Sequence, residues 1–222
     1  MNFAVIFDVD GVLLELTRDE EELFFDAFAK HLDASTLPRD WNSYRIRNDE
    51  DIIREIVDRY RLPPHDAATI TNEYLYTLKS ALARGLLSKP IEGAELLLRN
   101  LAPLTTLGIA TANFHHAAKL RLRQVNMWQY VSALAFGADG GGHKSEILAR
   151  AVAATGLPSS NIIFIGDNVN DVVAAIKNQT QFIGFSTSAA RLVQLRDAGA
   201  MHLSNAHDHT EKIVRQLLNA AN

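Results

Sequence analysis

The stretch Phe3-Ala4-Val5-Ile6-Phe7-Asp8-Val9-Asp10-Gly11-Val12-Leu13-Leu14 decides the fold of this chain. It begins with an uninterrupted run of apolar, β-branched and aromatic residues, which predicts a strand buried on both faces. The strand ends at two carboxylates and a glycine. Open α/β sheets bind their ligands at the carboxyl ends of the strands, so Asp8 and Asp10 are candidates for a functional site. Taken alone, Asp-x-Asp-Gly fits an ordinary turn equally well.

The composition excludes several classes of function. The 222 residues are 47% hydrophobic, which is enough for one large domain or for a core with a small insert. The net charge is -4 and the basic residues are scattered, so we expect neither nucleic acid nor a membrane as a partner. Without cysteine the chain has no disulfide, no thiolate nucleophile and no Cys-based zinc site. No apolar run reaches spanning length, and we expect a cytoplasmic monomer or homodimer that acts on a small molecule.

Residues 15–88 contain helical patterns only. Thr17 and Glu20 form a capping box that predicts a helix to about His31. Asn48 is placed to cap a second helix to about Tyr60, and a third is expected over residues 66–84. This composition differs from the parts on either side. We therefore predict a helical cap domain, residues 15–88, inserted into a core of residues 1–14 and 89–222.

From residue 89 onward, strand and helix patterns alternate. We expect strands over residues 105–111, 131–136, 161–165, 181–185 and 201–203, and helices over 92–100, 115–124, 144–155, 169–178, 188–198 and from 207. Strands separated by helices of this length predict a parallel sheet with right-handed crossovers and helices on both faces. The predicted fold class is α/β, a doubly wound, Rossmann-like core that carries an α-helical cap.

Three later stretches place polar residues at strand ends. Thr111-Ala112-Asn113 opens a helix, where backbone amides and the helix dipole favour an anion such as phosphate. Lys144 also opens a helix, and a cation is unfavourable at that end unless nearby acids attract it. The buried strand before Gly166 ends in Gly-Asp167, with Asp171 four residues later.

In this order the four stretches resemble motifs I to IV of the haloacid dehalogenase (HAD) superfamily, and the inserted helices resemble the cap of its phosphoglycolate phosphatase-like subclass. The resemblance implies that Asp8 is the nucleophile, that Asp10 is the general acid/base and that Lys144 pairs Asp8 with a phosphate oxygen. It implies a phosphate-binding role for Thr111. It also implies Mg²⁺ ligands, which we assign as the side chains of Asp8 and Asp167, the backbone carbonyl of Asp10, and Asp171 directly or through water. One departure is that no proline-rich turn follows Lys144.

Charge arithmetic independently favours a metal. Four carboxylates are expected at one sheet edge with Lys144 as their only cation, and each close like-charge pair costs on the order of 4 kcal/mol at an effective dielectric near 20. Hard oxygen ligands beside a phosphate-sized anion site point to Mg²⁺.

The sequence thus predicts a Mg²⁺-dependent phosphatase that hydrolyses a small phosphomonoester through an aspartyl-phosphate on Asp8. Expected substrate-binding residues are Gly11, Thr111, Ala112, Asn113, Arg45 and Arg47, with Tyr44 and Asn48 as further cap candidates. We expect His115, His116 and His143 to be surface or helix-capping residues, and Trp41 and Trp128 to be packing residues. The substrate itself stays open.

Four other functions share parts of this pattern. A sugar phosphomutase and a non-catalytic phosphate-ligand-binding protein both remain open. A binding protein that had lost its activity, however, would not need all of these residues. A haloalkanoate dehalogenase needs no acid at position 10. A receiver domain lacks an inserted cap and a Gly166-Asp167 pair.

Overall fold

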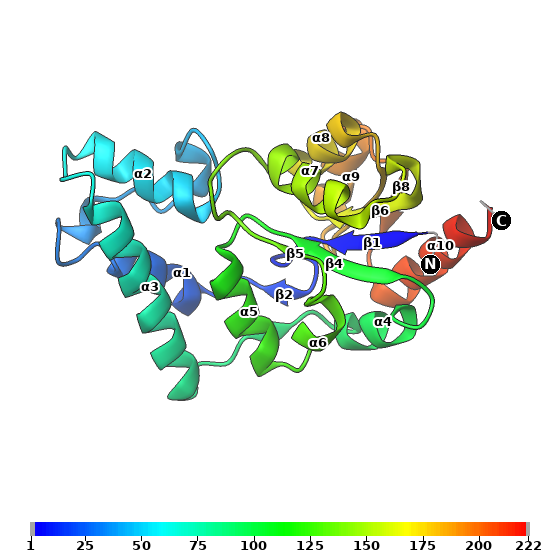
Figure 1. Ribbon diagram of the computed structural model, residues 1–222, viewed down its shortest axis with the longest axis horizontal. Coiled ribbons are helices and arrows are strands. Elements are labelled where there is room, and N and C mark those ends of the chain that lie inside the picture. Colours follow the sequence, from blue (N-terminus) through cyan, green and yellow to red (C-terminus); the bar gives the residue numbers. More distant parts are fainter. Residues whose placement is uncertain (1–2, 221–222) are drawn as a thin grey trace.

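Six parallel strands form the main sheet of the computed structural model, which describes residues 3–220 (Figure 1). Their order is β5-β4-β1-β6-β7-β8, and their bounds are β1 (Ala4–Phe7), β4 (Thr106–Ala110), β5 (Ala135–Phe136), β6 (Ile162–Gly166), β7 (Gln181–Phe185) and β8 (His202–Ser204). Strand β1 is central and wholly buried, with Phe7 in register with Ile109 on one side and Ile165 on the other. The apolar run that precedes Asp8 is therefore the middle of the sheet, as its composition predicts.

Helices cover both faces of this sheet. The first face packs against α4 (Ala94–Leu101), α5 (His115–Gln124), α6 (Trp128–Val131) and α10 (His207–Ala220). The second packs against α7 (Lys144–Thr155), α8 (Val169–Asn178) and α9 (Ala189–Asp197), with a short turn η3 (Ser159–Asn161) before β6. Along β1 the side chains alternate between these two cores, Val5 and Phe7 entering one and Ala4 and Ile6 the other. The predicted doubly wound α/β fold is confirmed.

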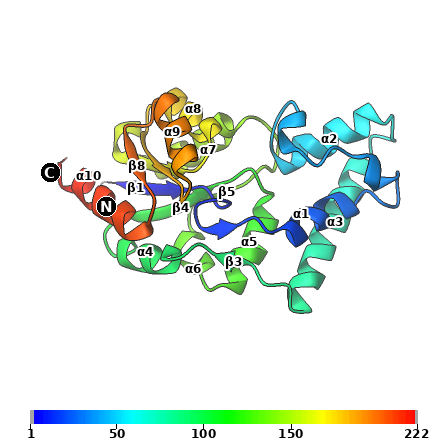
Figure 2. The same cartoon turned by 180° about the vertical axis from the view of Figure 1, so that it is seen from behind.

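A separate group of helices lies at one end of the sheet (Figures 1 and 2). It contains α1 (Arg18–Asp26), α2 (Asp49–Arg59) and α3 (Asp66–Ala83), with two short turns, η1 (Ala34–Thr36) and η2 (Trp41–Ser43). Its own core is built around Phe24, Phe28, Ile52 and Tyr74. The segments that enter and leave it pair as a two-stranded antiparallel ribbon, β2 (Leu14–Glu15) with β3 (Lys89–Pro90). This ribbon lies at both ends of the segment, residues 15–88, that we propose as the cap domain. Residues 1–2 and 221–222 of the proposed core lie outside the described residues.

Two predicted elements differ from the structure. Helix α1 ends at Asp26, and the chain continues to His31 in turns with hydrogen bonds between residues three apart. The His31 amide, for example, donates to the Phe28 carbonyl (2.8 Å). The strand predicted over residues 131–136 is wrong for residues 131–134, because Val131 completes α6 and only Ala135 and Phe136 pair with β4. An apolar run without clear periodicity fits either element. No helix within residues 3–220 combines the length and the apolar composition that crossing a membrane requires.

Candidate active site

The first site residue, Asp8, follows directly from the end of β1. Its backbone amide continues the sheet by donating to the Ile165 carbonyl (2.8 Å), and the Val9 amide donates to its own carboxylate (2.8 Å). The chain then turns sharply at Gly11, whose φ is +77°. A Cβ there would lie 2.4 Å from the Asp167 carboxylate, so only glycine lets the loop after β1 approach Asp167 this closely.

Lys144 lies between two of the predicted acids. Its Nζ is 2.6 Å from Asp8 and 3.0 Å from Asp171, and its side chain is 9% exposed. Burial disfavours its charged form, but the carboxylates of Asp171 and Asp8 outweigh burial and raise the Lys144 pKa. The same burial raises the Asp8 pKa to about 7 although Lys144 opposes the shift. The cation expected to be out of place at a helix N-terminus is therefore held there by two acids from neighbouring strand ends.

The loop before Lys144 takes a shape that only glycine adopts easily. Gly140, Gly141 and Gly142 all have positive φ, at 89°, 71° and 98°. This run precedes Lys144, whereas the proline-rich turn that the sequence lacks would follow it.

Asp167 and Asp171 complete an acidic cluster with Asp8. One carboxylate oxygen from each lies within 4.8 Å of the others. Burial raises the Asp167 pKa to about 8, and the charges of Asp171 and Asp8 add to the shift. Asp171 is fixed by local structure, since its carboxylate accepts the Asn168 amide (3.0 Å) in the capping box that starts α8. Three oxygen donors with an excess of negative charge fit a hard divalent cation.

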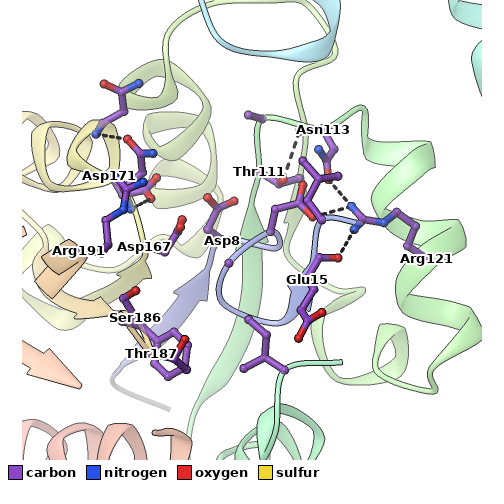
Figure 3. A pocket seen from close by; sticks show the side chains of 18 of the residues that line it. Asp8, Glu15, Thr111, Asn113, Arg121, Asp167, Asp171, Ser186, Thr187 and Arg191 are labelled. Carbon is purple, nitrogen blue, oxygen red and sulfur yellow. Dashed lines mark hydrogen bonds and ion pairs between the residues drawn. The ribbon is translucent and has the colours of Figure 1, made fainter. Parts of the chain in front are cut away.

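The turn after β4 faces this cluster from across β1. Thr111 is buried and its hydroxyl accepts the Asn113 amide (3.2 Å), which fixes the turn. The Phe114 amide is also committed, to the Asp49 carboxylate of the helical cap (2.7 Å). Figure 3 shows Thr111 and Asn113 on one side of Asp8, with Asp167 and Asp171 on the other.

Arg121 on α5 is a central residue that the sequence analysis missed. Its side chain is 2% exposed, and its Nη1 lies 2.8 Å from the Asp10 carboxylate in an ion pair without directed hydrogen-bond geometry. Its Nε and Nη2 donate to Glu20 at 2.8 and 3.2 Å, and Nη2 also donates to the Glu15 carbonyl (3.1 Å). The Asn113 side chain accepts from Nη1 (3.1 Å). One guanidinium thus joins Asp10, the start of the cap and the turn after β4.

The cap is docked onto the same loops through the first turn of α2. The Asn48 side-chain amide donates to the Gly142 carbonyl (2.8 Å), and the Gly142 amide donates to Asp51 (2.6 Å). The Asp49 backbone amide donates to the Ala112 carbonyl (3.0 Å). The acids that open α2 therefore also bind the loops that carry Thr111 and Lys144.

Core and cap enclose a cavity of about 950 Å³. The predicted site residues that line it are Asp8, Asp10, Gly11, Arg47, Thr111, Ala112, Asn113, Lys144, Asp167 and Asp171. Arg45 does not line it, because its guanidinium is 76% exposed and pairs with Glu55 (3.5 Å). Tyr44 is likewise turned into the cap, where its hydroxyl donates to the Pro38 carbonyl (2.8 Å).

The cavity lining also includes residues for which the sequence predicts no site role, among them Glu20, Glu21, Asp49, Tyr74, Arg191 and His207. Trp41, for which the sequence predicts packing, lines the cavity as well. Helix capping and apolar spacing explain most of these positions equally well, so no local signal singles them out. The three histidines at 115, 116 and 143 do not line the cavity, and His115 packs edge-on against Trp128 at 5.5 Å.

Comparison with known proteins agrees with this geometry. Residues 5–185 match the family of haloacid dehalogenase-like hydrolases, and the chain belongs to that family. Solved structures with the same fold include a predicted phosphatase from Clostridium acetobutylicum, at 22% identity and a TM-score of 0.70, covering 97% of this chain and 99% of that one. CbbY from Rhodobacter sphaeroides, in complex with phosphate, has 18% identity and a TM-score of 0.72, covering 93% and 95%.

A HAD family hydrolase from Deinococcus radiodurans R1, with bound phosphate and sodium, has 17% identity and a TM-score of 0.62, covering 97% of this chain and 96% of that one. Comparison with curated proteins gives no significant match.

Proposed function

We propose that this hydrolase is a Mg²⁺-dependent phosphatase that acts on a small phosphomonoester, with Asp8 as its nucleophile. The observation that carries the proposal is the position of Asp8, whose carboxylate lies 2.6 Å from Lys144 and within one cluster with Asp167 and Asp171. Lys144 favours the ionised form of the nucleophile against the effect of burial and supplies a positive charge for a phosphate oxygen. The Thr111 hydroxyl lies in the same cavity and is placed to bind a second phosphate oxygen.

Asp8, Asp167 and Asp171 fit a metal by donor type and spacing, and we assign Asp8, Asp167, the Asp10 carbonyl and, directly or through water, Asp171 as the residues that hold it. When bound, Mg²⁺ neutralises these carboxylates and the charge of the phosphate. Asp8 attacks phosphorus as the bond to the leaving alcohol breaks, and Asp10 gives that alcohol its proton. Asp10 then takes a proton from the water that hydrolyses the aspartyl-phosphate.

Arg121 positions Asp10 in this scheme. Asp10 is 22% exposed and could otherwise rotate freely, but the buried guanidinium 2.8 Å away limits the directions of its carboxylate. Since Arg121 also binds Glu20 and the Glu15 carbonyl, the position of the acid/base depends on that of the cap.

Phosphate release from a panel of small phosphomonoesters, measured with Mg²⁺ and with EDTA, tests the proposal. We expect release that needs Mg²⁺ and that Asp8→Asn abolishes, while Asp197→Asn, at an exposed position on α9, retains it. Asp8→Asn turnover equal to the wild type would overturn the assignment of the nucleophile. Transfer of phosphate to a sugar without net release would favour the phosphomutase instead.

A further inference from the structure

The wall of the cavity that belongs to the cap has an unusual composition. It contains Glu21, Phe24, Trp41, Asp49 and Tyr74, which we call the cap wall. The Trp41 indole donates to Glu21 (2.6 Å), and the rings of Trp41 and Tyr74 lie 5.3 and 5.2 Å from that of Phe24. These contacts join four of the residues into one surface, and Asp49 lines the same cavity, so the cap wall combines aromatic rings with two carboxylates.

The carboxylates of the cap wall differ from Glu20 in their partners, and burial raises the Asp49 pKa to about 7. In the described part of the chain, no lysine or arginine forms an ion pair with Glu21 or Asp49, whereas the neighbouring Glu20 is paired with Arg121. Asp49 is only 4% exposed, and its backbone-amide partner at Phe114 carries no charge. A buried carboxylate without a cation is costly, and proteins commonly relieve that cost with a partner of opposite charge.

Tyr74 supplies a further polar group to the cap wall. It is 6% exposed and lines the cavity, yet its hydroxyl makes no hydrogen bond to any of residues 3–220. Burial raises its pKa well above the usual value, and the nearby Asp49 charge adds to the shift. The hydroxyl is not one of the buried polar atoms that lack a partner, so it opens onto the cavity. The Tyr74 hydroxyl and the Asp49 oxygen that does not accept the Phe114 amide are therefore open to a group of the ligand.

We infer that the cap wall binds an ammonium group on the alcohol that leaves from phosphorus, so the substrate is the phosphomonoester of an amino alcohol. The inference rests on the proposed phosphatase function. An ammonium group can donate to Asp49 and to the Tyr74 oxygen, while Glu21 adds negative potential. The rings of Trp41 and Tyr74 attract a cation through their faces. A leaving group with a carboxylate would instead meet two uncompensated acids.

Arg47 is a cation of the same cavity that favours the opposite charge on the ligand. It lines the same cavity and donates to the Asn42 side chain (3.0 Å), while its Nε has no partner among the described residues. A substrate with a carboxylated leaving group would use Arg47 and avoid the cap wall. The two readings predict opposite orders of substrate preference.

Three matched two-carbon substrates separate these readings: O-phosphoethanolamine, 2-hydroxyethyl phosphate and 2-phosphoglycolate. With Mg²⁺ present, we expect kcat/KM to be highest for the ammonium compound and lowest for the carboxylate, with at least about tenfold between the extremes. Equal values, or a preference for 2-phosphoglycolate or 2-hydroxyethyl phosphate, would overturn the inference while leaving the phosphatase intact.

Two variants assign the preference to the cap wall. Tyr74→Phe and Asp49→Asn should each lower the ratio of kcat/KM for phosphoethanolamine over hydroxyethyl phosphate by about fivefold or more. Tyr76→Phe is the matched control, because Tyr76 lies on the same helix and Tyr76 is 71% exposed. If Tyr74→Phe does not fold, Asp49→Asn alone decides. An unchanged ratio in the folded variants would count against the cap wall.

Calorimetric binding of ethanolamine, ethylene glycol and glycolate gives a readout that needs no catalysis. Ethanolamine that binds more tightly than the other two, and less tightly to Asp49→Asn, would support the subsite even if no phosphate is released from any substrate. Tighter binding of ethanolamine without phosphate release from any substrate would reject the phosphatase and retain the ammonium site. Glycolate as the tightest ligand would reject the ammonium site.

Discussion

Replacing Arg121 with methionine would leave two carboxylates in the cavity wall without their cation. Glu20 is 3% exposed and keeps only neutral donors, the amide and hydroxyl of Thr17 and the hydroxyl of Ser88. Asp10 is more exposed, so water compensates part of its loss. Methionine fills much of the volume of the arginine stem, so that the change mainly removes charge and hydrogen bonds.

The magnitude follows from the burial of the pair. Removing one partner of a buried ion pair costs about 3–5 kcal/mol, because the other charge stays buried. A second substitution, Glu20→Gln, removes that stranded charge. We therefore expect Arg121→Met to cost about 4 kcal/mol in the free energy of unfolding, and the double variant to cost less than the sum of the single ones by about 2 kcal/mol.

Urea unfolding followed by circular dichroism measures these free energies. Arg123→Met is the control on the same helix, at an exposed position, and should lie within about 0.5 kcal/mol of the wild type. An Arg121→Met variant no less stable than this control, or a double variant whose loss equals the sum of the single losses, would refute the role given to the guanidinium. Arg121→Lys keeps the charge but loses the planar fork, and should recover only part of the stability.

Two further changes test the loop after β1, which contains Gly11 and the Val12 carbonyl that His207 contacts. Gly11→Ala should lower activity and the apparent Mg²⁺ affinity by about 10- to 100-fold, because the new Cβ would lie 2.4 Å from the Asp167 carboxylate. Gly85→Ala, also at positive φ but with no atom within 4 Å of its Cβ, is the control, and equal effects would show that backbone strain alone is responsible. Burial lowers the His207 pKa from 6.5 to about 4. As the pH falls, the unfolded state therefore protonates His207 before the folded state does. Roughly 3 kcal/mol of the free energy of unfolding, present above pH 6.5, should be lost as the pH falls toward 4. His207→Gln, which can still donate to the Val12 carbonyl, should lose less over that range, and parallel pH curves for the two proteins would contradict this account.

The sequence predicts the sheet well because its signals are local. Phe3 to Phe7 could only be a strand buried on both faces, and the acids, hydroxyl and lysine that follow strands or open helices had to meet at one sheet edge once the strands were parallel. Lys144 is an example, because a cation at a helix N-terminus is unfavourable and so indicates acidic partners elsewhere in the chain. Those partners prove to be Asp8 and Asp171.

The missed residues depend on contacts between distant segments. Arg121 lies 111 residues beyond Asp10 in the chain, inside a helix whose pattern gives no reason to bury an arginine. Nothing near it in the sequence distinguishes it from the exposed Arg123. Its partner Glu20 was assigned to a capping box, and the structure shows that this interpretation is correct but incomplete.

Asn48 shows why such assignments are incomplete in general. Its side-chain oxygen accepts the Asp51 amide (2.8 Å), which is the helix cap that the sequence indicates. Its side-chain nitrogen donates to Gly142, 94 residues away, and so fixes the cap to the loop before Lys144. A local pattern accounts for one polar atom of a side chain and says nothing of the other. Where both atoms form hydrogen bonds, one residue can cap a helix and also hold the cap domain against the core. The helix cap can be predicted from the local sequence, whereas the second contact is known only from the fold.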